Sequence, residues 1–188
     1  MTQPIVSVPC RSVVRGGPEA KPATSTGIAS GGVSDVIEVM RAARVDAPID
    51  TVWAVVSDAG RAADWFEFSE RTKVLEGEGV GQRRTQYGTW DRKRSEVDQE
   101  ITEFEPGRLL AWQHVAERLD GKPAPKFAVR TEFRIELTAD GDATTVRLRS
   151  IQEPGGALKG WLMKRFGTKE VARNLDRSLE RLGELVRP

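Results

Sequence analysis

The most regular pattern of hydrophobic and polar positions lies in the last thirty residues, from about 156 to 188. Apolar side chains recur there mostly three or four positions apart, which predicts a long helix with one apolar face: Leu158, Trp161, Leu162, Phe166, Val171, Ala172, Leu175, Leu179, Leu182 and Val186. The opposite side carries rows of arginines and acids that pair across a helical turn. A helix with one apolar face needs a partner surface to cover it.

The apolar face of this helix loses its regular spacing at one point. The step from Phe166 to Val171 is five residues long and contains Gly167. Glycine is a common site of irregularity in helices. We therefore predict a kink or thin point near Gly167, with an aromatic half before it and a leucine-rich half after it.

Between residues 35 and 153 the pattern changes to the alternation of strands. It is clearest over 127–137, where alternate residues are expected on one inner face and mostly charged residues on the other. The expected inner residues are Phe127, Val129, Thr131, Phe133, Ile135 and Leu137. Further strands are predicted at 36–45, 71–76, 82–87, 94–103, 108–114 and 144–150, and short helices at 50–56 and 62–66. Because tight turns join most strands, the sheet is expected to be antiparallel, which gives a two-layer α+β domain.

Composition adds limits to this picture. The chain has 188 residues, 29 basic and 28 acidic, so its net charge of +1 gives no argument for nucleic acid or an anionic membrane as a partner. Residues 1–34 contain no aromatic residue, which predicts a disordered N-terminal tail before a domain at 35–188. The tail is interpreted either as a plain leader or as a weakly basic interaction arm. Cys10 is the only cysteine, and no secretory signal or membrane-spanning run is visible, so we expect a soluble, cytoplasmic protein without stable membrane insertion.

The order of elements, with the residues that mark it, resembles the polyketide cyclase/dehydrase-like family of the START-like, or SRPBCC, superfamily. The matching stretches are Ala47 to Trp53, Ser57-Asp58, Asp64-Trp65, Gly79-Val80-Gly81, Glu100 to Leu110, and the end of the C-terminal helix at Leu182 to Leu185. The resemblance covers about residues 35–187. These marks are mostly structural, so they are more specific for a fold than for a function.

The resemblance implies a helix-grip fold, in which a curved antiparallel sheet of about seven strands wraps around the C-terminal helix and encloses a cavity. Members of this family bind lipids, polyketides, hormones or other apolar molecules, and a minority catalyse cyclisation or dehydration. The resemblance also implies that the aromatic half of the helix, before Gly167, lies closer to a ligand than the leucine-rich half.

The candidate ligand-binding residues are polar or aromatic side chains on the predicted inner face of the sheet and at its rim. Polar groups without partners are costly inside a filled core, whereas a cavity with a ligand or water relieves that cost. The set consists of Trp65, Phe66, Arg83, Thr85, Tyr87, Gln99, Trp112, His114, Thr131, Trp161 and Phe166. Two alternatives stay open: the strand parity slips by one residue, or these side chains reach water at strand ends.

Two of these residues are the candidates for a catalytic role. His114 is the only candidate for a proton shuttle near neutral pH, and Tyr87 is a candidate donor to a carbonyl or enolate. A structural His114 is the competing interpretation. One histidine and one cysteine cannot form a zinc site, so we predict no metal and no cofactor. Glu96, Asp98 and Glu100 are expected on the outer face, among charges of neighbouring strands.

Three functions remain open from the sequence. The first is binding of a small hydrophobic molecule by a monomer or homodimer, the second is a cyclase or dehydratase activity on a similar molecule, and the third is a protein-interaction module. A large cavity would favour the first two, and a filled core with an exposed apolar patch would favour the third. The basic residues beside Trp161 and Phe166, namely Lys159, Lys164, Arg165 and Lys169, are interpreted either as a membrane-docking face or as an ordinary solvated surface.

Overall fold

In the computed structural model, residues 36–187 are described, except for the side chain of Phe166. The elements run in the order β1 (Ile37–Val45), α1 (Ile49–Val56), η1 (Ala59–Arg61), α2 (Ala62–Trp65), β2 (Arg71–Glu76), β3 (Arg83–Trp90), β4 (Lys93–Glu105), β5 (Leu109–Leu119), β6 (Lys122–Pro123), β7 (Ala128–Asp140), β8 (Ala143–Pro154), α3 (Ala157–Leu162), η2 (Met163–Gly167) and α4 (Thr168–Leu185). The predicted tail, residues 1–34, lies outside the described residues, so its disorder stays a prediction.

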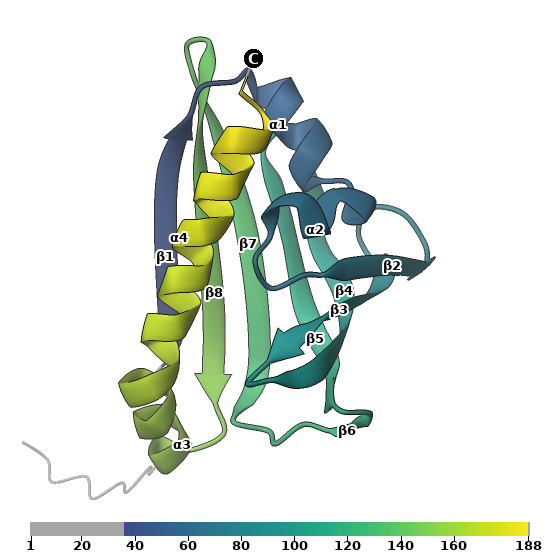
Figure 1. Ribbon diagram of the computed structural model, residues 1–188, viewed down its shortest axis with the longest axis vertical. Coiled ribbons are helices and arrows are strands. Elements are labelled where there is room, and N and C mark those ends of the chain that lie inside the picture. Colours follow the sequence, from purple (N-terminus) through teal and green to yellow (C-terminus); the bar gives the residue numbers. More distant parts are fainter. Residues whose placement is uncertain (1–35, 188) are drawn as a thin grey trace, which may run out of the picture. The chain divides into compact units, whose positions relative to one another are not determined.

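The strands form one antiparallel sheet in the order β1-β8-β7-β5-β4-β3-β2, with β6 added to β5. Two short helical segments, α1 and η1–α2, follow the first strand, and α4 lies along β1 and β8 (Figure 1). The predicted α+β helix-grip fold is therefore confirmed. Its strands are longer than the sequence predicted: β7 and β8, for example, continue to Asp140 and Pro154.

The hydrophobic core lies between the inner face of the sheet and the helices. Leu175, Leu179 and Leu182 of α4 are buried there, as are residues of α1 and α2. On β7 the predicted alternation holds toward its end, because Phe133, Ile135 and Leu137 are buried in the same core. It fails at the start, where Phe127 and Val129 are exposed and the register shifts between Ala128 and Arg130. The inner face of the sheet thus covers the apolar face of the leucine-rich half of the C-terminal helix.

The C-terminal helix changes geometry where its apolar spacing fails. Residues Met163–Gly167 form a π-helical turn between α3 and α4. A π-turn takes one more residue than an α-turn, which accommodates the five-residue step from Phe166 to Val171. The predicted irregularity near Gly167 is confirmed, in the form of a π-turn. Among the described helices, none is long and apolar enough to cross a membrane.

The outer face of the sheet is covered by ion pairs that join neighbouring strands. Arg149 of β8 bonds Glu38 of β1 at 2.8 Å and Glu136 of β7 at 3.0 Å. Farther along the sheet, Arg118 of β5 bonds Asp98 of β4 at 2.7 Å. The predicted outer position of Asp98 is confirmed.

Candidate ligand-binding site

A chain of buried polar side chains crosses β3 and β4 on the inner face of the sheet. Arg84 donates from Nε to Oε1 of Gln99 at 2.8 Å, and Gln99 donates from Nε2 to Oε1 of Gln86 at 3.0 Å. Gln86 in turn donates to the backbone carbonyl of Phe68 at 2.8 Å. Each glutamine has its amide oxygen and nitrogen engaged, so their orientation is fixed by the chain that starts at Arg84.

Aromatic rings surround the guanidinium of Arg84. Its Cζ lies 4.8 Å from the centre of the Trp112 ring, which stacks on Phe133 at 5.7 Å. Phe66 meets both Trp112 and Phe133 edge to face, at 5.6 and 5.8 Å. The rings give the cation a weak π partner but exclude water from it, so this part of the inner face combines an apolar wall with a single charge.

Arg84 is a buried cation that has no counterion within residues 36–187. Arg84 is 7% exposed, and no carboxylate among the described residues pairs with its guanidinium. Burial lowers the pKa of the guanidinium to about 10, which still leaves it charged at neutral pH. Because a buried charge is costly without a partner, an anion or a polarised oxygen placed beside Arg84 would gain interaction energy there.

A small pocket lies next to Arg84, between the sheet and the segment from α1 to α2. Its volume is about 10 Å³, room for about one water molecule. The indole N–H groups of Trp65 and Trp112 line it, and neither has a hydrogen-bond acceptor among the described residues. Asp58 also lines the pocket and accepts a bond from the backbone N–H of Gly60. The buried side-chain groups of the lining that lack a partner among the described residues are thus the two indole donors, which suit an oxygen acceptor, while Asp58 adds a carboxylate to the lining.

His114 lies on the same inner face, farther along β5. It pairs opposite Gln99 in the register of β4 and β5, and its ring stacks on Phe133 at 5.6 Å. Its Nδ1 lies 2.7 Å from Oε1 of Glu117, and this contact is the main cause of a lowered pKa for the Glu117 carboxyl. The carboxylate fixes the orientation of the imidazole and leaves Nε2 as the nitrogen available to a ligand.

Four of the predicted site residues lie on the inner face of the sheet as expected: Gln99, Trp112, His114 and Thr131. Trp65 and Phe66 are core residues rather than rim residues, since they are 2% and 4% exposed. Trp161 is exposed on α3. The side chain of Phe166 lies outside the described residues. Whether any of these residues binds a ligand stays a prediction.

The predicted parity of β3 is wrong by one residue. Arg83, Thr85 and Tyr87 belong to the outer side: Arg83 is exposed beside Glu76, Thr85 donates to Asp98, and Tyr87 lies under Arg71. Tyr87 and His114 are therefore on opposite faces, so they do not form the predicted catalytic pair. The inner residues of β3 are Arg84 and Gln86, which the sequence did not single out.

The register set by the β3–β4 turn places Arg84 on the inner face of the sheet. Asp91 and Arg92 both have positive φ, at 47° and 61°, as in a two-residue hairpin turn, and Trp90 pairs with Lys93. This register places Arg84 opposite Gln99. An arginine with positive φ is uncommon, so the sequence does not predict this turn.

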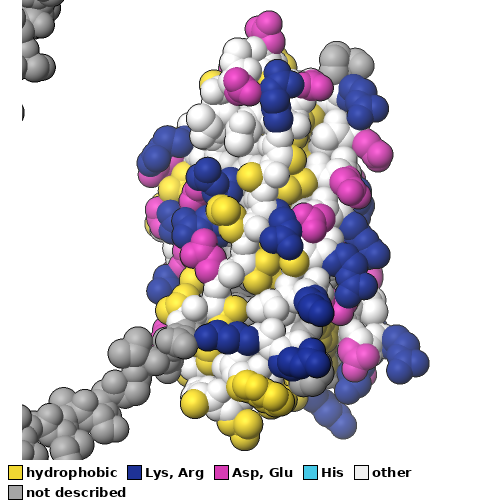
Figure 2. Space-filling view, turned by 90° about the vertical axis from the view of Figure 1, so that its left-hand side faces the viewer, with side chains coloured by type: hydrophobic (Ala, Val, Ile, Leu, Met, Phe, Trp, Pro, Cys, Tyr) yellow, Lys and Arg dark blue, Asp and Glu magenta, His cyan; other side chains and the backbone are white. Residues whose placement is uncertain are grey.

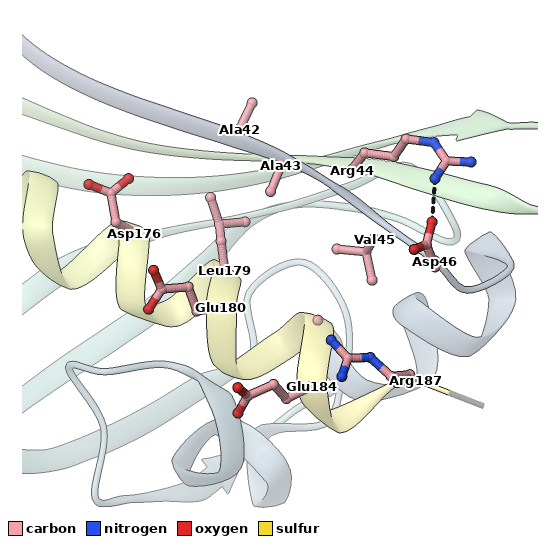
Figure 3. Close-up of a pocket in the computed structure, with 11 residues that line it drawn as sticks. Ala42, Ala43, Arg44, Val45, Asp46, Asp176, Leu179, Glu180, Glu184 and Arg187 are labelled. Carbon is pink, nitrogen blue, oxygen red and sulfur yellow. Dashed lines mark hydrogen bonds and ion pairs between the residues drawn. The ribbon is translucent and has the colours of Figure 1, made fainter.

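A larger groove lies elsewhere, between β1 and α4. It has a volume of about 480 Å³ and exists because small residues, among them Ala42, Ala43 and Gly183, line it (Figure 3). Its remaining lining consists of acids and arginines, among which Arg44 pairs with Asp46, and of the apolar residues Val45 and Leu179. The groove contains no aromatic residue and no buried charge, so it lacks the features of the site beside Arg84.

The fold and the site define a class. An antiparallel sheet that grips a C-terminal helix is the helix-grip arrangement of the START-like or SRPBCC superfamily. Within it, the chain belongs to the polyketide cyclase / dehydrase and lipid transport family, whose sequence model matches residues 36–187. No curated protein matches the sequence.

Solved structures share the fold at low sequence identity. The Zhui aromatase/cyclase from Streptomyces sp. R1128 is 18% identical with a TM-score of 0.63, over 80% of this chain and 93% of that one. A START superfamily protein from Mycobacterium smegmatis is 15% identical with a TM-score of 0.63, over 80% and 99%. Major latex-like protein 151 from Panax ginseng is 11% identical with a TM-score of 0.61, over 81% and 99%. At these identities the likeness concerns the fold alone.

Proposed function

We propose that this protein binds a small hydrophobic molecule that carries an exposed oxygen acceptor, such as a carbonyl, a phenolate or a carboxylate. The observation that carries the proposal is Arg84, a buried cation without a carboxylate partner among aromatic rings. Family membership supports it, because the family is described by polyketide chemistry and lipid transport. The aromatic walls select an apolar body, and the donors at Arg84, Trp65 and Trp112 select the oxygen.

The pocket beside Arg84 is far smaller than the cavity expected from the sequence, and this filled core by itself favours the protein-interaction alternative. Ligand binding therefore requires the inner face to open. The pocket beside Arg84 holds about one water, and Phe66 and Phe68 occupy the adjacent space against Phe133. Both phenylalanines follow α2, where the chain enters β2. We propose that this segment shifts when a ligand enters, so that the rings of Phe66 and Phe68 pack on the ligand instead of on Phe133.

The test uses two probes that share a ring system and differ in their oxygen atoms. Naphthalene-2-carboxylate and 2-methylnaphthalene are titrated into the full chain, and binding is followed by tryptophan fluorescence. The wild type is expected to prefer the carboxylate by at least about tenfold, because a hydrogen bond to a charged group is worth about 1.5–3 kcal/mol. Arg84→Met is expected to remove this preference and to keep the affinity for 2-methylnaphthalene.

Arg83→Met is the matched control, since Arg83 precedes Arg84 in the chain but is exposed on the outer face. It should leave both affinities unchanged. Equal loss in the two variants, or a wild type that binds neither probe, contradicts the proposal. In the second case the pocket beside Arg84 is a site for structural water.

His114 favours a second function, an enzyme of the cyclase or dehydratase type. Its ring stacks on Phe133, which belongs to the aromatic cluster beside Arg84, and the carboxylate of Glu117 orients the imidazole. In this reaction Nε2 of His114 takes a proton from the carbon beside a ketone, and Arg84 bonds the enolate oxygen that forms. His114→Ala would then abolish turnover of a linear poly-β-ketone and spare its binding. Loss of binding and turnover together would leave His114 a binding residue.

A further inference from the structure

An apolar surface lies at the end of the domain formed by α3 and the start of β7. Four of its side chains are strongly exposed: Phe127 (47%), Val129 (68%), Leu158 (72%) and Trp161 (58%). We call these four residues the apolar tip. Figure 2 shows hydrophobic side chains gathered at this lower end of the molecule, beneath lysines and arginines. None of the four contributes to the polar chain at Arg84, so the site described above does not explain their exposure.

Two hydrogen bonds join the parts of the chain that build the tip. The backbone N–H of Gly155 donates to the carbonyl of Phe127 at 2.9 Å. Nζ of Lys159 donates to the carbonyl of Lys126 at 2.7 Å. The loop before β7 is thereby fixed to the first turn of α3, which holds Phe127 and Leu158 in one surface. The tip is a built feature of the fold.

The two chain segments that build the tip carry charge of one sign, although Glu117 of β5 lies near enough to Lys126 for this lysine to help lower the pKa of its carboxyl group. Residues 121–129 and 154–169 contain no aspartate or glutamate, although the whole chain has 28 acids. The same two segments carry six exposed basic residues, which we call the basic rim: Lys122, Lys126, Lys159, Lys164, Arg165 and Lys169. The nearest acids in the chain are Asp120, Glu153 and Glu170, just outside these segments. A protein of net charge +1 thus concentrates positive charge around its most exposed aliphatic and indole side chains.

We propose that the apolar tip and the basic rim form a docking surface for an anionic lipid bilayer. Leu158 and Trp161 are one helical turn apart, so both can enter the boundary between headgroups and acyl chains, where indole rings are favoured. The lysines then lie at the level of the lipid phosphates, with their aliphatic stems along the apolar boundary. The docking is peripheral, since α3 is six residues long and the tip penetrates only by single side chains.

Charge decides between this partner and a second copy of the chain. Two basic rims placed face to face would repel each other, so a symmetric dimer through the tip is disfavoured. An anionic bilayer supplies both an apolar interior and negative charge over a continuous area. An acidic protein groove offers the same chemistry over a smaller area, and the experiment below separates it from a bilayer.

The experiment measures co-sedimentation of the full chain with lipid vesicles. Vesicles of phosphatidylcholine alone are compared with vesicles of phosphatidylcholine and phosphatidylglycerol at a ratio of 7:3, at low and at 0.5 M salt. Binding is expected only to the anionic vesicles and only at low salt. Lys126→Gln with Lys169→Gln is expected to weaken binding about 25-fold, since each basic residue near an anionic surface contributes about fivefold. Leu158→Ser with Trp161→Ser is expected to weaken it by a similar factor.

Two controls separate docking from other effects. Lys73→Gln with Leu75→Ser changes an exposed lysine and leucine on β2 by the same substitutions and should leave vesicle binding intact. Arg84→Met should also leave it intact, so a failure of the proposed ligand site does not affect this test. No binding to the anionic vesicles overturns the proposal, as does binding that survives loss of Leu158 and Trp161. Dimerisation that the tip variant abolishes overturns it in favour of a second copy, and capture of an acidic peptide without vesicle binding does so in favour of a protein partner.

Discussion

Arg84 and Arg83 are neighbours in the chain with opposite surroundings. Arg84 faces aromatic rings and a glutamine, whereas Arg83 faces solvent and Glu76 at 3.4 Å. The sequence could not separate them, because β3 contains polar residues on both faces and its one tyrosine lies on the outer side. A strand without hydrophobic alternation has no pattern from which to read its inner face. Only the hairpin register fixes it, and that register depends on an unusual turn.

Gly88 is the residue that allows the polar chain at Arg84 to close. A Cβ at this position would lie 2.7 Å from the carbonyl oxygen of Phe68, which accepts the hydrogen bond of Gln86. Gly88→Ala is expected to lower the free energy of unfolding by about 1–3 kcal/mol, because a backbone oxygen has to move. Urea unfolding measures the change. Gly183→Ala is the control: a Cβ there meets nothing within 4 Å, so a small gain in stability is expected from its helical position.

Elements with a regular spacing of hydrophobic residues were predictable from the sequence, and those with irregular geometry were not. The alternation over 127–137 and the leucine spacing after Val171 gave β7 and α4 correctly, because one face of each is buried in the core. The bulge that shifts register between Asp98 and Gln99 left no trace in the sequence, nor did the short strand β6. The inner-face positions predicted on β4 and β5 were therefore correct, as was Thr131 on β7, and those predicted on β3 were wrong by one residue.

Ser178 connects α4 to the segment that carries the aromatic rings of the site. Its buried Oγ accepts from the backbone N–H of Glu67 at 3.0 Å and donates to the carbonyl of Asn174 at 2.7 Å. Ser178→Ala is expected to lower the free energy of unfolding by about 1–2 kcal/mol, because the N–H of Glu67 loses its acceptor. Glu180→Ala, an exposed change on the same helix, should stay within about 0.5 kcal/mol. Equal effects of the two substitutions would show that Ser178 does not fix this segment.

At the scale of the whole molecule, the two faces of the sheet differ in the side chains that they carry. The inner face carries the core and a single uncompensated charge, while the outer face is covered by ion pairs that run from β1 to β4. Because those pairs bridge strands distant in sequence, their protonation acts on the sheet as a unit. The basic rim interrupts this balance at one end of the domain, which is why we assign docking to that end.

The outer ion pairs predict how stability depends on pH. Hydrogen bonds from Arg149 lower the pKa of Glu38, and the same arginine together with Arg147 lowers that of Glu136 against the opposing effect of burial. A lowered folded-state pKa gives stability that is present above the ordinary value of 4.5 and is lost as the pH falls through the folded-state value. Arg149→Met removes the shared partner. It should lower the free energy of unfolding by about 1 kcal/mol at pH 7, with allowance for solvent screening.

The same variant should flatten the loss of stability below pH 4.5, since both carboxyl groups return toward their ordinary pKa and bind protons alike in the folded and unfolded states. Urea unfolding at pH 7, 5, 4 and 3 measures this slope. Arg83→Met, which removes an exposed pair with Glu76, should keep the wild-type slope. If Arg149→Met also keeps it, the acid limb of the stability curve does not arise from the bridge that Arg149 makes between β1 and β7. Asp98 and Glu117, whose pKa values Arg118 and His114 lower, are then the groups to test.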